Sequence, residues 1–201
     1  MNIKTALCAA ALLGAASVNT SMAMDQGDWL VRLGASSVQP KSNNSPVVSV
    51  DSATSATINF SYMMTDNWAV ELLAAYPFEH DISLVGGPKV GSTEHLPPTV
   101  SLQYHFLPDS TFQPYLGAGI NYTTFFSEKL YGQLEGASLD LSDSWGWAAE
   151  AGIDFMLNET WFLNLNVRYI DIETDAKVNG DPLGQVAIDP WVYGGHVGLR
   201  F

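Results

Sequence analysis

Trp191-Val-Tyr-Gly-Gly-His-Val-Gly-Leu-Arg-Phe201 is the last stretch of the chain, and its residues alternate between two kinds. Every second position counted back from Phe201 is apolar, aromatic or glycine: Leu199, Val197, Gly195, Tyr193 and Trp191. The positions between them are mostly small or polar. A period of two indicates a β-strand with two unlike faces. A strand that ends on an aromatic ring is typical of a closed sheet whose apolar face meets lipid.

The same alternation occurs in eight segments: 28–36, 55–64, 68–76, 98–107, 113–126, 144–157, 160–173 and 190–201. Three connections are short (65–67, 108–112 and 158–159), and four are long (37–54, 77–97, 127–143 and 174–189). Short turns at one end and long loops at the other predict an all-β fold, an eight-stranded antiparallel up-and-down transmembrane β-barrel. We expect residues 24–201 to form this one domain, with flexible extracellular loops and both termini on the periplasmic side.

Residues 1–23 are typical of a secretory signal peptide. Lys4 precedes an apolar run at 6–16, and Ser21-Met22-Ala23 resembles a cleavage site. The run is too short for a membrane-spanning helix. Cys8 has no lipid-attachment motif before it, so we expect no lipid anchor. Cleavage before Met24 would leave a mature chain without cysteine, and therefore without disulfides.

The charge balance is acidic and limits the classes of partner. The net charge of the whole chain is −13, and it becomes −14 once Lys4 is removed. Nucleic-acid binding is disfavoured because it requires a basic face. Solvated loops account for the acidic residues, with a specific cation site as the alternative. After residue 23 no apolar stretch reaches ~18 residues, the length that a membrane-spanning helix requires.

The two faces of the predicted strands differ in charge. Their apolar face, represented by Leu33, Leu72, Ile120 and Leu165, carries no charged residue. A charge on the lipid-facing side costs about 2–4 kcal/mol at the bilayer midplane, so lipid outside the barrel requires this segregation. The polar face places the following residues inside: Arg32, Asn59, Glu71, Gln103, His105, Asn121, Glu150, Asp154, Asn164, Asn166, Arg168, His196 and Arg200.

The six tryptophans provide a second indication of a membrane. Trp29, Trp68 and Trp161 lie at predicted strand ends next to the short turns, whereas Trp145, Trp147 and Trp191 lie next to the long loops. Two aromatic belts are typical of a membrane barrel. The alternative is a soluble eight-stranded barrel of the lipocalin type, in which the apolar face would point inward.

Several stretches of the chain resemble those of one known protein family, and they follow one another in the order that the family has. They include Trp29-Leu-Val-Arg-Leu-Gly34 and Leu96-Pro-Pro-Thr-Val-Ser-Leu-Gln-Tyr-His-Phe106, together with 66–80, 113–124, 143–154, 161–172 and the Phe201 ending. With these stretches the chain resembles the outer membrane protein W (OmpW/AlkL) family over nearly all of its mature length. Loop 37–54 is the least family-like part. The resemblance implies a barrel in the Gram-negative outer membrane, associated with passage of small hydrophobic molecules and with stress responses. It also implies recognition of the Phe201 strand by the barrel-assembly machinery.

The predicted lumen has two halves. In the middle and periplasmic half we expect a charged layer of three arginines and three carboxylates: Arg32, Arg168, Arg200, Glu71, Glu150 and Asp154. Eight strands enclose a space that side chains nearly fill, so a wide aqueous pore is not expected. The layer is interpreted as a structural plug, with ion selectivity as the alternative. The extracellular half is predicted to form a hydrophobic vestibule that binds an apolar ligand at Leu73, Ala75, Phe125, Ile170 and Val192.

Prolines suggest a way out of this vestibule. Pro77, Pro97 and Pro98 flank the outer ends of the third and fourth predicted strands. Proline donates no hydrogen bond to a β-ladder, so this lateral seam is a candidate exit for apolar molecules into the bilayer. The alternative is that these prolines only end their strands. The predicted function is passive uptake of small hydrophobic molecules, with outer-membrane lipid and the apolar ligand as partners.

Other functions have weaker support. Some eight-stranded outer-membrane barrels modify lipid A, but no nucleophile motif surrounds a serine here, and no catalytic residue or cofactor is predicted. His80 and His95, in a predicted loop, could bind a metal with Asp81 or Glu94, yet the spacing is not a known ligand pattern, so no metal site is predicted. The remaining alternative is a structural or surface-interaction barrel whose loops 77–97 and 127–143 bind a phage, host or matrix partner. The sequence leaves the ligand, the oligomeric state and the regulatory trigger open.

Overall fold

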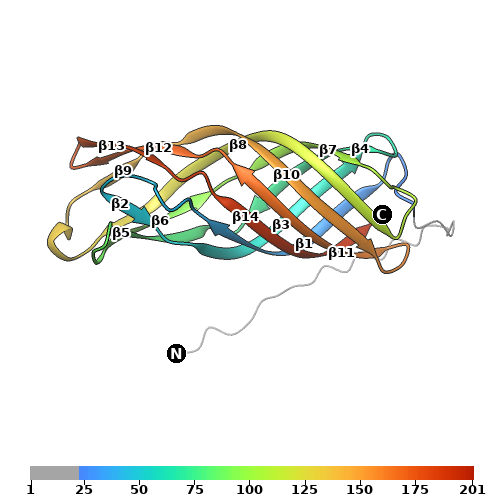
Figure 1. Cartoon of the computed structure of the whole chain (residues 1–201), viewed down its shortest axis with the longest axis horizontal. Helices are drawn as coiled ribbons and strands as arrows, with labels where there is room; N and C mark the ends of the chain where they lie inside the picture. The colour runs from blue at the N-terminus through green and yellow to red at the C-terminus, as the bar shows by residue number, and fades with distance from the viewer. Residues whose placement is uncertain (1–22) are drawn as a thin grey trace, which may run out of the picture.

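Eight antiparallel strands form a closed barrel in the computed structural model, which describes residues 23–201 (Figure 1). The predicted signal peptide therefore lies almost entirely outside the described residues, and its cleavage stays a prediction. Around the barrel the order is β10-β11-β14-β1-β3-β4-β7-β8, and pairing of β8 with β10 closes it. The strands are β1 (Trp29–Gln39), β3 (Ala53–Met63), β4 (Trp68–Ala75), β7 (Thr99–His105), β8 (Phe112–Leu130), β10 (Ser144–Met156), β11 (Trp161–Ile170) and β14 (Trp191–Arg200).

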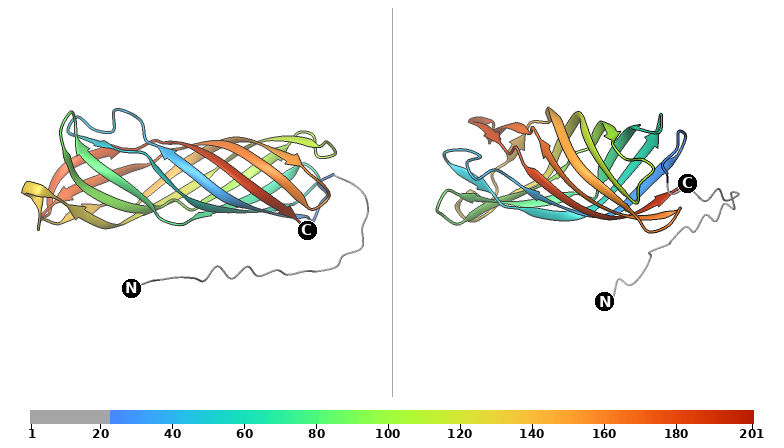
Figure 2. Two further views of the ribbon diagram at one scale, coloured as in Figure 1. Left: turned by 90° about the horizontal axis from the view of Figure 1, so that it is seen from below. Right: turned by 45° about the vertical axis from the view of Figure 1, so that its right-hand side comes forward.

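The long connections, which were expected from the sequence to be loops, contain further strands. They contain β2 (Val48–Val50), β5 (Phe78–Leu84), β6 (Lys89–Leu96), β9 (Leu139–Leu141), β12 (Glu173–Val178), β13 (Asp181–Ala187) and a 3-10 turn, η1 (Gly132–Leu134). Strands β6, β5 and β2 continue the barrel sheet outward from the long β8, while β13, β12 and β9 form a second sheet. The barrel wall thereby continues past the closed eight-stranded part as an extension, at the end where extracellular loops were predicted (Figure 2).

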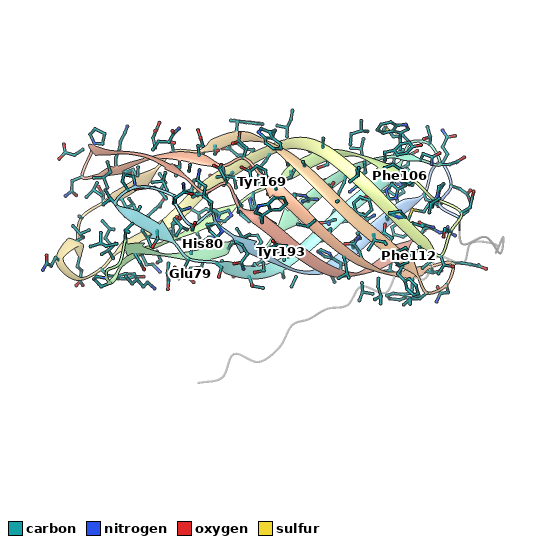
Figure 3. All side chains as sticks on the ribbon, in the orientation of Figure 1. Glu79, His80, Phe106, Phe112, Tyr169 and Tyr193 are labelled. Carbon is teal, nitrogen blue, oxygen red and sulfur yellow. The ribbon has the colours of Figure 1, made fainter. Side chains whose placement is uncertain are left out.

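The alternation of faces predicted for the strands is observed. Leu33, Ile120 and Leu165 are 62–65% exposed on the outer face, although they are large and apolar. All six tryptophans are exposed as well. Phe106 and Phe112 lie at the end with the short turns, and Tyr169 and Tyr193 lie nearer the extension (Figure 3). We take the membrane-spanning segments as the parts of the barrel strands between these two belts.

Among residues 23–201, no helix has the length and apolar character needed to cross a membrane.

The barrel interior has three layers. At the periplasmic end an apolar cluster closes the lumen: Met24, Leu30, Met63, Ala69, Met156 and Phe162. A layer of buried charged and polar side chains lies above it. Toward the extension a larger apolar cluster begins, which includes Val38, Phe78, Phe125, Ile170 and Val192. The sequence interpretation placed charge through the whole periplasmic half, so the methionine-rich cluster, here termed the periplasmic plug, is an addition to it.

Candidate functional site

The charged layer is a chain of ion pairs that starts at Arg32 on β1. Its guanidinium donates two hydrogen bonds to Asp154 on β10, Nε to Oδ1 at 3.1 Å and Nη2 to Oδ2 at 2.7 Å. Its Nη1 donates to Ser61 Oγ at 2.6 Å and to Glu71 Oε2 at 3.2 Å. Arg32 is fully buried. This two-pronged geometry is the strongest form of arginine–carboxylate pairing.

Arg168 on β11 completes the chain. Its Nη2 lies 2.5 Å from Glu71 Oε1 and 2.5 Å from Glu150 Oε2. Gln103 Nε2 donates to the second oxygen of Glu150 at 3.0 Å. The pairs therefore run Asp154–Arg32–Glu71–Arg168–Glu150 across the lumen, and all five side chains are buried. Five of the six residues predicted for the charged layer are brought together here, in a form suited to sealing the lumen.

Arg200 is the exception and corrects the prediction. It follows Leu199 at the periplasmic end of β14, where its guanidinium contacts the carbonyl oxygen of Ala23. Its Nε also lies 3.8 Å from Asp28 Oδ2. The inward direction was predicted correctly, but the height was not, because Arg200 lies close to the strand end. The network thus has two arginines and three carboxylates.

A second polar chain lies beside the ion pairs and bears on the enzyme alternative. Thr57 Oγ1 is 2.8 Å from His196 Nε2, and His196 Nδ1 is 3.2 Å from Asn164 Oδ1. This order matches a hydroxyl, a base and an orienting amide. However, Thr57 is buried and its hydroxyl also bonds Ser36 at 2.9 Å. The chain therefore supports the wall and offers a substrate no approach to the hydroxyl.

An apolar cavity of about 260 Å³ lies beyond the outer aromatic belt. One wall comes from β2, β5, β6 and β8, and the other from β9, β12, β13 and η1. Aliphatic side chains such as Val50, Ile82, Leu141 and Val186 predominate in its lining. We refer to this cavity as the vestibule pocket. It exists because the two extension sheets bury their apolar faces against each other while leaving space between them.

The residues predicted for the vestibule occupy two levels. Phe125 lines the pocket itself. Ile170 and Val192 belong to the apolar cluster directly beneath the pocket, and Ala75 packs against this cluster. Phe125, Ala176 and Ile188 belong both to the cluster and to the pocket lining. Leu73 is buried on β4 but is not a member of that cluster or of the pocket lining. The prediction identified the floor and missed most of the walls, which come from segments expected to be loops.

Two histidines in the pocket wall were also expected to lie in a flexible loop. His80 on β5 and His95 on β6 are each 2% exposed, and their rings stack with centroids 4.8 Å apart. Burial is the main cause that lowers the pKa of His95 to about 3, and the neighbouring His80 lowers it further. Burial also lowers the pKa of His80. Both rings are therefore neutral at physiological pH. Asp81, considered with them from sequence, pairs with Lys89.

The predicted lateral seam coincides with a break in backbone pairing. The β4–β7 ladder ends at Leu73 and Thr99, and pairing resumes between β5 and β6 at Phe78 and His95. Pro77, Pro97 and Pro98 lie in the interval. Asn121 Nδ2 donates to the carbonyls of Pro97 at 3.1 Å and Pro98 at 3.2 Å, which holds the β7 side to β8.

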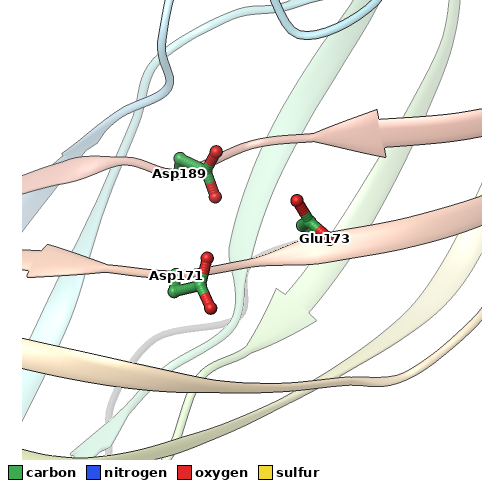
Figure 4. A group of neighbouring side chains, drawn as sticks. All are labelled: Asp171, Glu173 and Asp189. Carbon is green, nitrogen blue, oxygen red and sulfur yellow. The ribbon is translucent and has the colours of Figure 1, made fainter.

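An acidic cluster lies at the junction between barrel strands β11 and β14 and strand β12 of the extension. Carboxylate oxygens of Asp171, Glu173 and Asp189 lie within 4.8 Å of one another (Figure 4). Asp189 is already paired, since Lys41 Nζ lies 2.7 Å from its Oδ2 and the amide of Ile172 donates to its Oδ1 at 3.2 Å. The lysine therefore neutralises one of the three carboxylates.

A known protein family, and relatives and solved structures within it, match this chain over most of its length. The OmpW family model matches residues 25–201. The chain belongs to the OmpW family. It is 44% identical to Outer membrane protein W of Vibrio cholerae, covering 95% of this chain and 96% of that protein. The crystal structure of OprG from Pseudomonas aeruginosa superposes with a TM-score of 0.81 at 37% identity, covering 90% of this chain and 99% of that one.

This OmpW-family chain is therefore a β-barrel of the Gram-negative outer membrane, as the sequence predicted. The lipocalin-type alternative is excluded. A more distant relative is the Dibenzothiophene metabolism operon protein PahQ of Pseudomonas aeruginosa, which is 26% identical and covers 72% of this chain and 70% of that protein.

Proposed function

We propose that the barrel mediates passive uptake of small hydrophobic molecules, which bind in the vestibule pocket and leave sideways into the bilayer. The observation that carries this proposal is the apolar pocket, separated by an apolar cluster from a lumen that ion pairs fill. An apolar molecule gains free energy by leaving water for such a pocket. The pocket therefore captures apolar molecules at the outer surface, ahead of the polar headgroup region.

The sealed lumen determines the second half of the proposed route. A molecule moving straight through would have to part Arg32, Glu71 and Arg168 without replacing their hydrogen bonds, at the full cost of desolvated charge. The break in pairing between β4 and β7 requires no such loss, because few hydrogen bonds cross it. We propose that molecules leave at this seam, between Pro77 on one side and Pro97 and Pro98 on the other.

The name of one relative fits this class of cargo. PahQ is named for an operon of dibenzothiophene metabolism, and dibenzothiophene is a small apolar aromatic. The proposal includes no catalytic step and no cofactor, and the buried Thr57 hydroxyl accords with that. Its partners are the apolar cargo, the surrounding lipid and, during biogenesis, the barrel-assembly machinery acting on the Phe201 strand. Nucleic acid is not among them.

Filling the pocket tests the proposal. Ala176 on β12 is buried and lines the pocket, whereas Lys177 beside it points outward and is exposed. We expect Ala176→Trp to reduce uptake of an apolar fluorescent tracer to the level of membranes without the protein, because the indole takes up the binding volume. Uptake is measured in proteoliposomes, with barrel folding checked by electrophoretic mobility. Lys177→Trp is the matched control and keeps wild-type uptake; equal uptake by the two variants would contradict the proposal.

A surface-interaction role is the second candidate, and it has its own observation. Val47, Val85 and Leu183, near the outer end of the extension, are about 60% exposed, which favours contact with another surface. Val47 and Leu183 also line the vestibule pocket, whereas Val85 does not. This candidate therefore predicts that Val85→Ser weakens binding to whole cells or matrix while leaving tracer uptake intact.

A further inference from the structure

The strongest unexplained feature of the molecule is a set of buried ring nitrogens in the pocket wall. Phe78, His95 and His80 form a continuous stack, with centroids 5.4 Å apart for Phe78–His95 and 4.8 Å apart for His95–His80. Phe125 packs against His95 at 5.9 Å. Strands β5 and β6 fix this arrangement, because Phe78 pairs directly with His95 and His80 with Thr93. Figure 3 shows His80 within the extension, away from the membrane-spanning part.

The hydrogen-bonding capacity of these rings is mostly unused. His80 Nδ1 lies 2.6 Å from the carbonyl oxygen of Asp51, so this nitrogen carries the proton and donates it. Nε2 of the same neutral ring is then an acceptor, and it has no partner among the described residues. Neither nitrogen of His95 has a partner there. One neutral imidazole of this kind offers one donor and one acceptor.

A purely structural stack would be better served by apolar rings. A buried polar atom without a partner destabilises the folded state, whereas phenylalanine would fill the same space without that cost. Both histidines line the vestibule pocket, which is otherwise almost entirely aliphatic. The nitrogens of His95 are buried, so a ligand reaches one only after the ring turns; no hydrogen bond holds this ring among the described residues, and its terminal torsion is soft.

We propose that His80 and His95 form a polar recognition element, so that the pocket selects apolar molecules carrying one hydroxyl group, such as phenols and alkanols, over bare hydrocarbons. This inference rests on the proposed function and names its preferred cargo. The ligand hydroxyl donates to His80 Nε2 and accepts from the N–H of His95, which completes the pairing of His80 and gives His95 one of its two hydrogen bonds. The rest of the ligand stays against the aliphatic lining.

The size of the pocket suits this class. An apolar protein cavity of about 150 Å³ accommodates benzene, so a cavity of about 260 Å³ has room for a two-ring molecule. Naphthalene and 1-naphthol are therefore a matched pair of probes, because they differ by a single hydroxyl group.

The experiment compares the two probes on the mature chain in lipid nanodiscs. Both probes also dissolve in lipid. For each protein we therefore take the ratio of its affinity for 1-naphthol to its affinity for naphthalene. The measured quotient is this ratio in the wild type divided by this ratio in His95→Phe. Lipid partitioning cancels in this quotient. We expect a quotient of about three to ten, the range for the loss of one net hydrogen bond. Glu79→Gln is the control, because Glu79 neighbours His80 but is exposed on the opposite face of β5, and its quotient stays at one.

A second readout does not depend on any variant. In the wild-type protein labelled with ¹⁵N at histidine, 1-naphthol shifts the ring-nitrogen resonances of His80 and His95, and naphthalene leaves them in place. This result decides the matter even if His95→Phe does not fold. A quotient of one, or unchanged nitrogen resonances on 1-naphthol binding, overturns the histidine proposal alone. Absence of binding by both probes overturns the proposed function together with it.

Discussion

Replacing Arg32 with methionine destabilises the barrel by about 3–5 kcal/mol, the usual cost of removing one partner from a buried ion pair. Arg32 is fully buried and donates hydrogen bonds to Asp154, Ser61 and Glu71. Without the guanidinium, Asp154 loses the arginine that pairs with it in the closed lumen, and Glu71 is left with Arg168 alone. The free energy of unfolding is measured by urea titration of the protein in lipid vesicles. Adding Asp154→Asn to Arg32→Met recovers part of the loss, because it removes the charge left without its arginine.

Lys41→Met is the matched control for that experiment. Lys41 also pairs with an aspartate at 2.7 Å, but its side chain is 34% exposed at the barrel rim. Solvent screens this pair, so we expect a change of about 0–1 kcal/mol. If Arg32→Met were as mild as Lys41→Met, the charged layer would not be a structural seal.

Cross-linking the seam is expected to stop uptake of apolar molecules. Ala74 and Pro98 are the next facing positions beyond the Leu73–Thr99 pair, at the level where the β4–β7 ladder is interrupted. With Ala74→Cys and Pro98→Cys, an oxidant joins the two strands there. We expect tracer uptake in proteoliposomes to fall to background after oxidation and to recover with a reductant. The chain has one cysteine, Cys8, in the predicted signal peptide, so the new pair has no competitor in the mature protein.

A second cross-link serves as the control for position. Leu72 and Val100 already face each other within the intact ladder, so a disulfide between cysteines at these positions closes nothing that was open. Its oxidation is expected to leave uptake unchanged. Equal uptake by the oxidised and reduced forms of the Ala74–Pro98 variant would remove the lateral route and leave the pocket without an assigned exit.

The barrel was predictable because lipid imposes a regular pattern on sequence. Charges such as Glu71 and Arg168 must face inward, large apolar residues such as Leu165 must face outward, and tryptophans gather at the two interfaces. These constraints act on every strand, so errors in one segment do not alter the overall assignment. Strand ends were less accurate: β8 runs to Leu130, beyond the predicted end at 126.

The extension could not be predicted in the same way, since no lipid requires its strands to alternate. Gly86-Gly87-Pro88 favoured a long loop, whereas it is only the turn between β5 and β6. The burial of His80 and His95 depends on the facing sheet of β9, β12 and β13, which is distant in sequence. Their spacing of 15 residues resembles no known motif. The alternation Thr174, Ala176, Val178 was the one available signal for β12.

Parallel measurement of ion current and apolar uptake tests the central claim most directly. That claim is that apolar molecules pass this barrel while its lumen stays closed. The mature protein is reconstituted in lipid bilayers, and steady conductance is recorded in a planar membrane while tracer uptake is followed in vesicles of the same lipid and protein content. The account predicts tracer uptake with conductance at the baseline of bare lipid. Large steady ion currents at the protein density that supports uptake would contradict it, because they require an open aqueous path past Arg32 and Arg168.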